Sequence, residues 1–121
     1  MSKVLIIDDD DLFRGLLEAA FGNDGHEVLI AEDGEHGVAS AKVSLPDIII
    51  TDMNMPRMTG WQVLDALKAD AATESIPVVV LSAQRTSQDI DEAHMRGCAA
   101  YLVKPIDILD MMAKVRGILG S

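Results

Sequence analysis

The chain has 121 residues, a formal net charge of -10 and 49% hydrophobic residues. This length suits one domain with its own core, so we expect a single domain over residues 1–121 with no output domain. The negative charge opposes nucleic-acid backbones, and we expect no direct nucleic-acid binding. Because no stretch is long and apolar enough to cross a bilayer and no signal-peptide pattern is present, we expect no membrane insertion and a cytoplasmic location.

Apolar runs alternate five times with helix-period segments, which is the pattern of strand–helix units around a parallel sheet. The first strand is predicted over residues 3–7 and is followed by an acidic run that begins at Asp8. A helix follows, and its apolar stripe is predicted to face the core: Leu12, Phe13, Leu16, Leu17, Ala20 and Phe21. Gly22 and Gly25 end this helix, and residues 26–31 form a more polar strand suited to a sheet edge.

The third apolar run, residues 47–52, is predicted to be a central strand because its β-branched residues can be buried on both faces. A helix marked by Val38, Ala41 and Leu45 precedes it. Asp52 lies at the carboxyl end of this strand, where ligands bind in open α/β sheets. Asp is also a common turn residue, so Asp52 alone does not decide between a site and a turn.

A loop to Gly60 leads to a third helix, and the apolar run 76–81, which ends at Ser82, is predicted to be a second central strand. Trp61 is interpreted as a packing residue and Cys98 as a small buried residue. The histidines are interpreted as surface residues: His26, His36 and His94.

Thr86 and Asp89 form a cap pattern for a fourth helix, which ends near Gly97. Its clear apolar residues are few, so we expect it to be the least firmly held helix: Ile90, Ala93 and Met95. A fifth strand over residues 99–103 leads to Lys104. The last helix combines a cap with an apolar stripe: Asp107, then Ile108, Met112, Val115 and Leu119.

Five alternating units fit a flavodoxin-like (βα)5 fold, with a parallel sheet of strand order 2-1-3-4-5 and helices on both faces. In this order, polar residues that are distant in sequence follow four of the strands along one rim of the sheet: Asp8, Asp9, Asp52, Ser82 and Lys104. Each of them has a plainer interpretation as a cap, a turn residue or a solvated cation. Their joint placement favours a site.

The clustered carboxylates need a positive partner, because two unit charges 4 Å apart interact by about 4 kcal/mol at an effective dielectric near 20. Mg²⁺ prefers oxygen ligands and is typically held by one or two carboxylates and a phosphate. The EF-hand pattern for calcium is absent. With a metal in place, a carboxylate can attack phosphorus to form an acyl phosphate. Lys104 would then neutralise charge on the phosphoryl oxygens, and Ser82 would donate a hydrogen bond.

The sequence resembles the receiver domain of two-component response regulators over essentially its whole length. Four motifs match in order and at family-like spacing: Ile-Ile-Asp-Asp in strand one, Asp-Met-Asn-Met-Pro with Gly60 in strand three, Leu-Ser-Ala in strand four and Tyr-Leu-Val-Lys-Pro in strand five. The resemblance implies a stand-alone, chemotaxis-regulator-like receiver domain over residues 1–121.

This resemblance implies that Asp52 accepts a phosphoryl group from a histidine kinase or a histidine phosphotransfer protein in a Mg²⁺-dependent reaction. Asp9 is then a direct metal ligand, together with Asp52 and the main-chain carbonyl of Asn54, and Asp8 acts on the metal largely through water. Such a domain is a phosphorylatable signalling module that assists its own phosphorylation and dephosphorylation, rather than an enzyme.

The resemblance also implies a switch. Ser82 supplies the switch hydroxyl, Lys104 contacts the phosphate, and Tyr101 is the rotating aromatic residue. Together they alter the face built from the fourth helix, fifth strand and fifth helix, which signals to a downstream protein target. Pro105 follows a cis peptide bond in this family. Ile106 departs from the phenylalanine that the family often carries at that position.

Two alternatives stay open at this stage. A small Mg²⁺-dependent aspartyl phosphatase of the haloacid-dehalogenase type uses the same kinds of residue, and Asp8 with Asp10 matches its Asp-x-Asp motif. That family places its nucleophile on strand one and generally needs a longer chain. The other alternative is a receiver-like docking module that is never phosphorylated, although the complete set of site residues argues against it.

Overall fold

The computed structural model describes residues 2–120, in which five strands alternate with five helices. The strands are β1 (Lys3–Ile7), β2 (Glu27–Ala31), β3 (Ile48–Asp52), β4 (Val78–Ser82) and β5 (Ala100–Val103). The helices are α1 (Asp11–Asn23), α2 (Gly34–Ser44), α3 (Gly60–Ala69), α4 (Ser87–Met95) and α5 (Ile108–Leu119). Within residues 2–120, no helix is long and apolar enough to cross a membrane.

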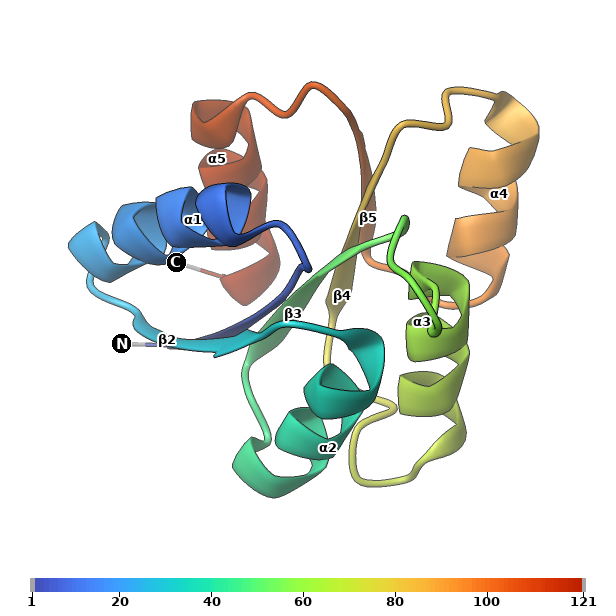
Figure 1. Ribbon diagram of the computed structural model, residues 1–121, viewed down its shortest axis with the longest axis horizontal. Coiled ribbons are helices and arrows are strands. Elements are labelled where there is room, and N and C mark those ends of the chain that lie inside the picture. The colour runs from blue at the N-terminus through green and yellow to red at the C-terminus, as the bar shows by residue number, and fades with distance from the viewer. Residues whose placement is uncertain (1, 121) are drawn as a thin grey trace.

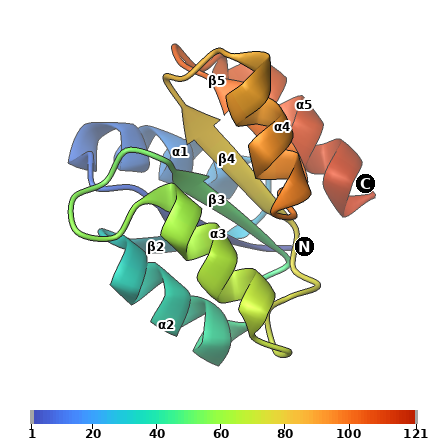
Figure 2. The same cartoon turned by 90° about the vertical axis from the view of Figure 1, so that its right-hand side faces the viewer.

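All five strands pair in parallel in the order β2-β1-β3-β4-β5, which confirms the predicted flavodoxin-like sheet. Helices α1 and α5 cover one face, and α2, α3 and α4 cover the other (Figures 1 and 2). Every residue of β3 and β4 is buried. The more polar β2 lies at the sheet edge, as predicted.

Each face of the sheet has its own apolar layer, because successive side chains of a strand point to opposite faces. In β1, Val4 and Ile6 pack toward α1 and α5, whereas Leu5 and Ile7 pack toward the other three helices. The α1–α5 layer is completed by helix residues that include Leu17, Phe21, Met111 and Val115. The opposite layer includes Val38, Leu64, Leu67 and Ala93.

The apolar stripe of α1 is narrower than predicted. Leu12 is 78% exposed and Leu16 is 51% exposed, so the expectation that they join the core is wrong. At about 100° per residue these two positions lie at one edge of the stripe, and the helix packs through the positions centred on Leu17 and Phe21 instead.

Three further predictions need correction. Leu45, which we used to mark the second helix, lies outside it as an exposed C-cap in the left-handed region (φ 48°), because Pro46 disfavours a helical residue before it. His26 is mostly buried beside Phe21, because the turn at Gly25 (φ 88°) folds it over the end of α1. Strand β4 begins two residues later than predicted, after Pro77, which lacks the N–H that a central strand needs.

Helix α4 has the thinnest apolar contact, as predicted, with Ala93 as its single buried residue. Met95, which we assigned to its stripe, is exposed. Arg96, directly after the helix, bridges to α3: its Nη1 lies 2.8 Å from Asp65 Oδ2, and its guanidinium lies 5.0 Å from the centre of the Trp61 ring. Polar contacts therefore supplement the small apolar contact of this helix.

Candidate functional site

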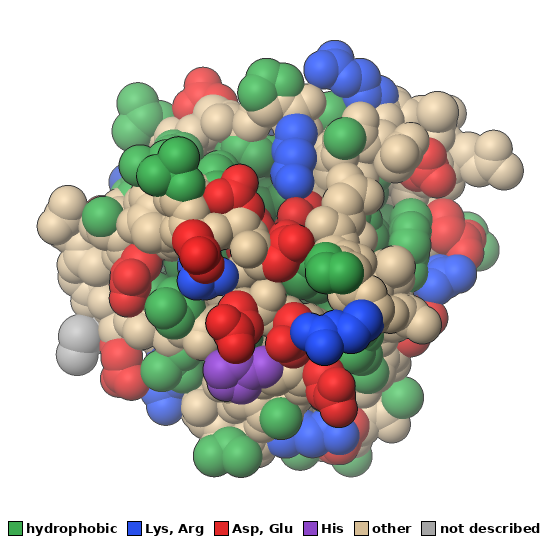
Figure 3. Space-filling model, in the orientation of Figure 1, with side chains coloured by type: hydrophobic (Ala, Val, Ile, Leu, Met, Phe, Trp, Pro, Cys, Tyr) green, Lys and Arg blue, Asp and Glu red, His purple; other side chains and the backbone are tan. Residues whose placement is uncertain are grey.

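Three carboxylates meet where β1 and β3 end. Asp8 and Asp9 follow β1, Asp52 is the last residue of β3, and these two strands are neighbours in the sheet. One oxygen from each residue lies within 4.8 Å of the others. Asp8 and Asp52 are buried, and Asp9 is exposed. Acidic side chains gather near the centre of the face in Figure 3, with basic side chains beside them.

A lysine that follows the edge strand β5 completes this cluster. Lys104 follows β5, and its Nζ donates a hydrogen bond to Asp52 Oδ1 at 2.8 Å. The N–H of Asn54 donates to the same oxygen at 3.3 Å. Within residues 2–120, both hydrogen bonds to the Asp52 side chain therefore end on Oδ1. The peptide bond between Lys104 and Pro105 is cis.

The pKa of the Asp8 carboxyl is raised in this cluster. Burial raises this pKa from the ordinary 3.8 to about 6, although a hydrogen bond from the Asp10 N–H opposes the rise. The charges of Asp52 and Asp9 raise this pKa further, and the charge of Lys104 lowers it. Within residues 2–120, Asp8 Oδ2 is buried and has no hydrogen-bond partner.

This donor set fits a hard divalent cation. A buried carboxylate oxygen without a partner, held beside two more carboxylates, is the arrangement that a bound cation would stabilise. All the donors are oxygen atoms, which Mg²⁺ prefers over nitrogen or sulfur. Asp8, Asp9 and Asp52 are therefore the residues that can hold such an ion.

The cluster opens into a cavity of about 550 Å³. Its lining combines the acids and Lys104 with apolar residues of α1, of the loop after β5 and of the start of α5: Phe13, Leu16, Pro105, Ile106 and Ile108. We did not assign these apolar residues to the site from the sequence, because the α1 stripe indicated packing only. Leu16 is partly exposed because it lines this cavity.

Ser82 and Tyr101 contact the same residue, Gln84, in the loop between β4 and α4. The Gln84 N–H donates to Ser82 Oγ at 3.0 Å, and the Tyr101 hydroxyl donates to the Gln84 carbonyl oxygen at 3.0 Å. Ser82 is buried on the same rim as Asp52, but within residues 2–120 no hydrogen bond joins its hydroxyl to Asp52 or Lys104. Nothing in the sequence pattern singled out Gln84.

A family model described as the response regulator receiver domain matches residues 4–116. The chain belongs to this family. The predicted family and fold are thereby confirmed, and the chain is a receiver domain of two-component signalling.

Proteins of similar sequence and structure are known. Protein PilH of Pseudomonas aeruginosa is 34% identical over 121 residues, which is 100% of both chains. The Vibrio cholerae chemotaxis protein CheY4 has a TM-score of 0.91 and 29% identity, with 98% of each chain covered. For other curated relatives, the chain spans 26% to 52% of their length.

The receiver domain of the sensor histidine kinase PA1611 from Pseudomonas aeruginosa shares the fold, with a TM-score of 0.88 and 23% identity. The alignment covers 99% of this chain and 98% of that one. The PA1611 structure contains a magnesium ion coordinated in its active site cleft.

Proposed function

We propose that this receiver domain accepts a phosphoryl group on Asp52 from a histidine kinase or a histidine phosphotransfer protein in a Mg²⁺-dependent reaction. The observation that carries this proposal is the setting of Asp52. Its carboxylate lies within 4.8 Å of Asp8 and Asp9 oxygens and 2.8 Å from Lys104 Nζ. A carboxylate nucleophile thus stands between a cation site and a fixed ammonium group, which is the charge arrangement that phosphoryl transfer needs.

In this proposal the residues that hold Mg²⁺ are Asp9, Asp52 and the main-chain carbonyl of Asn54, with Asp8 acting largely through water. The ion, when bound, neutralises charge on the phosphoryl oxygens. Asp8 supports this assignment, because its buried oxygen has no hydrogen-bond partner within residues 2–120. The PA1611 receiver domain, which shares the fold, holds a magnesium ion in its active site cleft, and this supports the choice of Mg²⁺.

Asp52 and Lys104 have different roles in the proposed phosphoryl transfer. Asp52 Oδ2 attacks the phosphorus atom, since Oδ1 is engaged by Lys104 and Asn54. A P–O bond forms to Asp52, the P–N bond to the donor histidine breaks, and the histidine nitrogen keeps the electron pair. Lys104 pairs with the phosphoryl oxygens. Later attack by water on phosphorus releases phosphate and restores the carboxylate, so the domain assists its own dephosphorylation.

The output of this reaction is a change in the face formed by α4, β5 and α5, to which a downstream protein target binds. Ser82 turns its hydroxyl toward the phosphoryl group and disturbs its bond to Gln84. Gln84 is also the hydrogen-bond acceptor of Tyr101, so the change at Ser82 can release the tyrosine ring. The proposal includes a cytoplasmic location and no direct nucleic-acid contact.

An intact-mass measurement tests this function. The protein is incubated with Mg²⁺ and acetyl phosphate, alongside Asp52→Asn and a matched control, Asp110→Asn, which changes an exposed acid on α5. We expect a single phosphoryl adduct in the wild type and the control, and none in Asp52→Asn or after chelation. Turnover of acetyl phosphate without an adduct would favour the phosphatase. Neither turnover nor an adduct would favour the docking module.

A further inference from the structure

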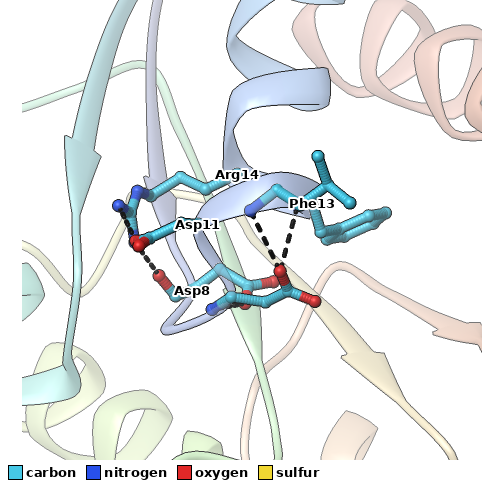
Figure 4. A network of polar contacts seen from close by, with 6 residues as sticks. Asp8, Asp11, Phe13 and Arg14 are labelled. Atoms are coloured by element: carbon cyan, nitrogen blue, oxygen red, sulfur yellow. Dashed lines mark hydrogen bonds and ion pairs between the residues drawn. The ribbon is translucent and has the colours of Figure 1, made fainter.

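Arg14 in α1 reaches back over the loop that joins β1 to α1 (Figure 4). Its Nη1 donates to the main-chain carbonyl of Asp8 at 2.8 Å, and its Nη2 pairs with the carboxylate of Asp11. Only 14% of the arginine side chain is exposed. We propose that Arg14 is a positioning residue for the cation site, where it holds the Asp8–Asp9 peptide in the orientation that binds metal. This inference rests on the proposed metal site.

The position of the contact gives Arg14 this role. The Asp8 carbonyl belongs to the planar peptide group that also contains the N–H of Asp9. A hydrogen bond that fixes this carbonyl therefore fixes the point from which the Asp9 side chain leaves the main chain. Asp9 is exposed, and within residues 2–120 its carboxylate accepts no hydrogen bond. The main chain that Arg14 holds therefore fixes the position and direction of the Cα–Cβ bond of Asp9, from which the carboxylate reaches the cation site.

The loop needs such an anchor because its four consecutive acids repel one another. Asp10 is fixed by capping α1, with its Oδ1 accepting the N–H groups of Leu12 and Phe13 at 3.0 and 3.2 Å. Asp8 follows β1, and its N–H donates to the carbonyl oxygen of Ala31 in β2 at 3.1 Å. The peptide between Asp8 and Asp10 is held by Arg14, whose planar fork contacts a carbonyl and a carboxylate together. Lysine, with a single ammonium group, reproduces this geometry only in part.

A positioning role and a purely electrostatic role of Arg14 predict opposite changes in Mg²⁺ affinity when this side chain is removed. A positive charge close to a cation site repels the cation, so removal of this charge by itself strengthens Mg²⁺ binding. Loss of the anchor lets the Asp8–Asp9 peptide turn, which weakens binding. Residues that orient metal ligands typically contribute about 10–100-fold to metal affinity. We therefore expect Arg14→Ala to weaken Mg²⁺ binding by about 10-fold.

The experiment is a Mg²⁺ titration of the unphosphorylated chain. Binding is measured by calorimetry and, independently, by the amide chemical shifts of residues 8–11. The variants are Arg14→Ala and Arg14→Lys, with Arg116→Ala as the control. Arg116 carries the same charge but pairs with Asp24 at the far end of α1. We expect weaker binding in Arg14→Ala, an intermediate affinity in Arg14→Lys and no weakening in Arg116→Ala.

A kinetic measurement separates positioning from a general loss of structure. With acetyl phosphate, Arg14→Ala should need more Mg²⁺ for half-maximal phosphorylation yet approach the wild-type rate at saturating Mg²⁺. Equal or tighter Mg²⁺ binding in both Arg14 variants would overturn the role of Arg14 and leave the proposed function intact. A wild-type chain that binds no Mg²⁺ would overturn both. If Arg14→Ala does not fold, the Mg²⁺ affinity of Arg14→Lys is the test. Weaker binding than in the wild type supports the role of Arg14, and equal or tighter binding overturns it.

Discussion

Asp8 is 1% exposed beside Asp9 and Asp52, and burial raises the pKa of its carboxyl group to about 6. The unfolded chain has no such burial, so its Asp8 ionises at the ordinary 3.8. The folded state therefore binds a proton more readily than the unfolded state. In this case stability falls as the pH rises from about 4 to about 6, and the whole penalty is present above that range.

We therefore predict that Asp8→Asn stabilises the metal-free protein. At about pH 7.5 the free energy of unfolding should rise by roughly 1–3 kcal/mol, since one pKa unit is about 1.4 kcal/mol and solvent screens part of the effect. Most of this gain should vanish near pH 4.5, where Asp8 is protonated in the folded wild type. Urea unfolding in a chelator, with Asp110→Asn as the control, measures it. A gain of equal size at both pH values would contradict the account.

At the level of single elements, the strands could be predicted because few alternatives fit their sequences. The β-branched runs of β3 and β4 are buried on both faces, which only central parallel strands provide. The caps of α4 and α5 were also predictable, because Thr86 and Asp107 accept main-chain N–H groups at short sequence separation. The exposure of Leu12 was not, because the stripe does not show which of its edges the sheet covers.

Some residues of the site could likewise be predicted from the sequence, and others could not. Parallel topology places Asp8, Asp52 and Lys104 at one rim, so their meeting followed from strand order. Gln84 and Arg14 were not identified, because their contacts depend on side-chain directions in three dimensions. For Arg14 one signal was present: its spacing of three residues from Asp11 places the two side chains on the same face of a helix.

Gly60 connects the site to α3, and we predict that Gly60→Ala is destabilising. A Cβ at Gly60 would lie 2.6 Å from the Cα of Met53 and 2.7 Å from the carbonyl oxygen of Asp52, and neither main-chain atom can move away easily. We expect a loss of about 1–3 kcal/mol in the free energy of unfolding. Gly15→Ala is the matched control, because open space surrounds that helical position. This substitution should raise the free energy of unfolding by about 0.5–1 kcal/mol. Equal effects in denaturant unfolding would show that the close approach is unimportant.

Arg96 holds α4 against α3, and its removal should loosen α4. Because Ala93 is the only buried residue of α4, we expect the contacts of Arg96 with Asp65 and Trp61 of α3 to form much of its anchorage. Arg96→Ala should lower the opening free energy of residues 87–95 by about 1 kcal/mol, seen as several-fold faster amide hydrogen exchange. Lys114→Ala, which removes an exposed ion pair within α5, should leave that exchange unchanged. Unchanged exchange in Arg96→Ala would contradict this view of α4.

In the molecule as a whole, a phosphorylation switch works only if a change at the sheet rim reaches the α4–β5–α5 face. The rim holds Asp52, and the loop that carries Gln84 leads directly into α4. A helix with so small a buried contact is the element that a small change biases most easily. To move such an equilibrium from 1:99 to 99:1 requires about 5.5 kcal/mol of differential binding. A phosphoryl group that contacts Lys104, Ser82 and a metal ion can supply a good part of this.

The most direct test of the central claim, that modification of Asp52 reaches the α4–β5–α5 face, is the amide chemical-shift change on addition of beryllofluoride with Mg²⁺. We expect saturable changes around Asp52 that extend into residues 86–97 and 99–103, and that are absent in Asp52→Asn. Changes confined to the loops around Asp9, Asp52 and Lys104 would contradict this claim. The domain would then act as a docking module or a phosphate sink rather than a switch.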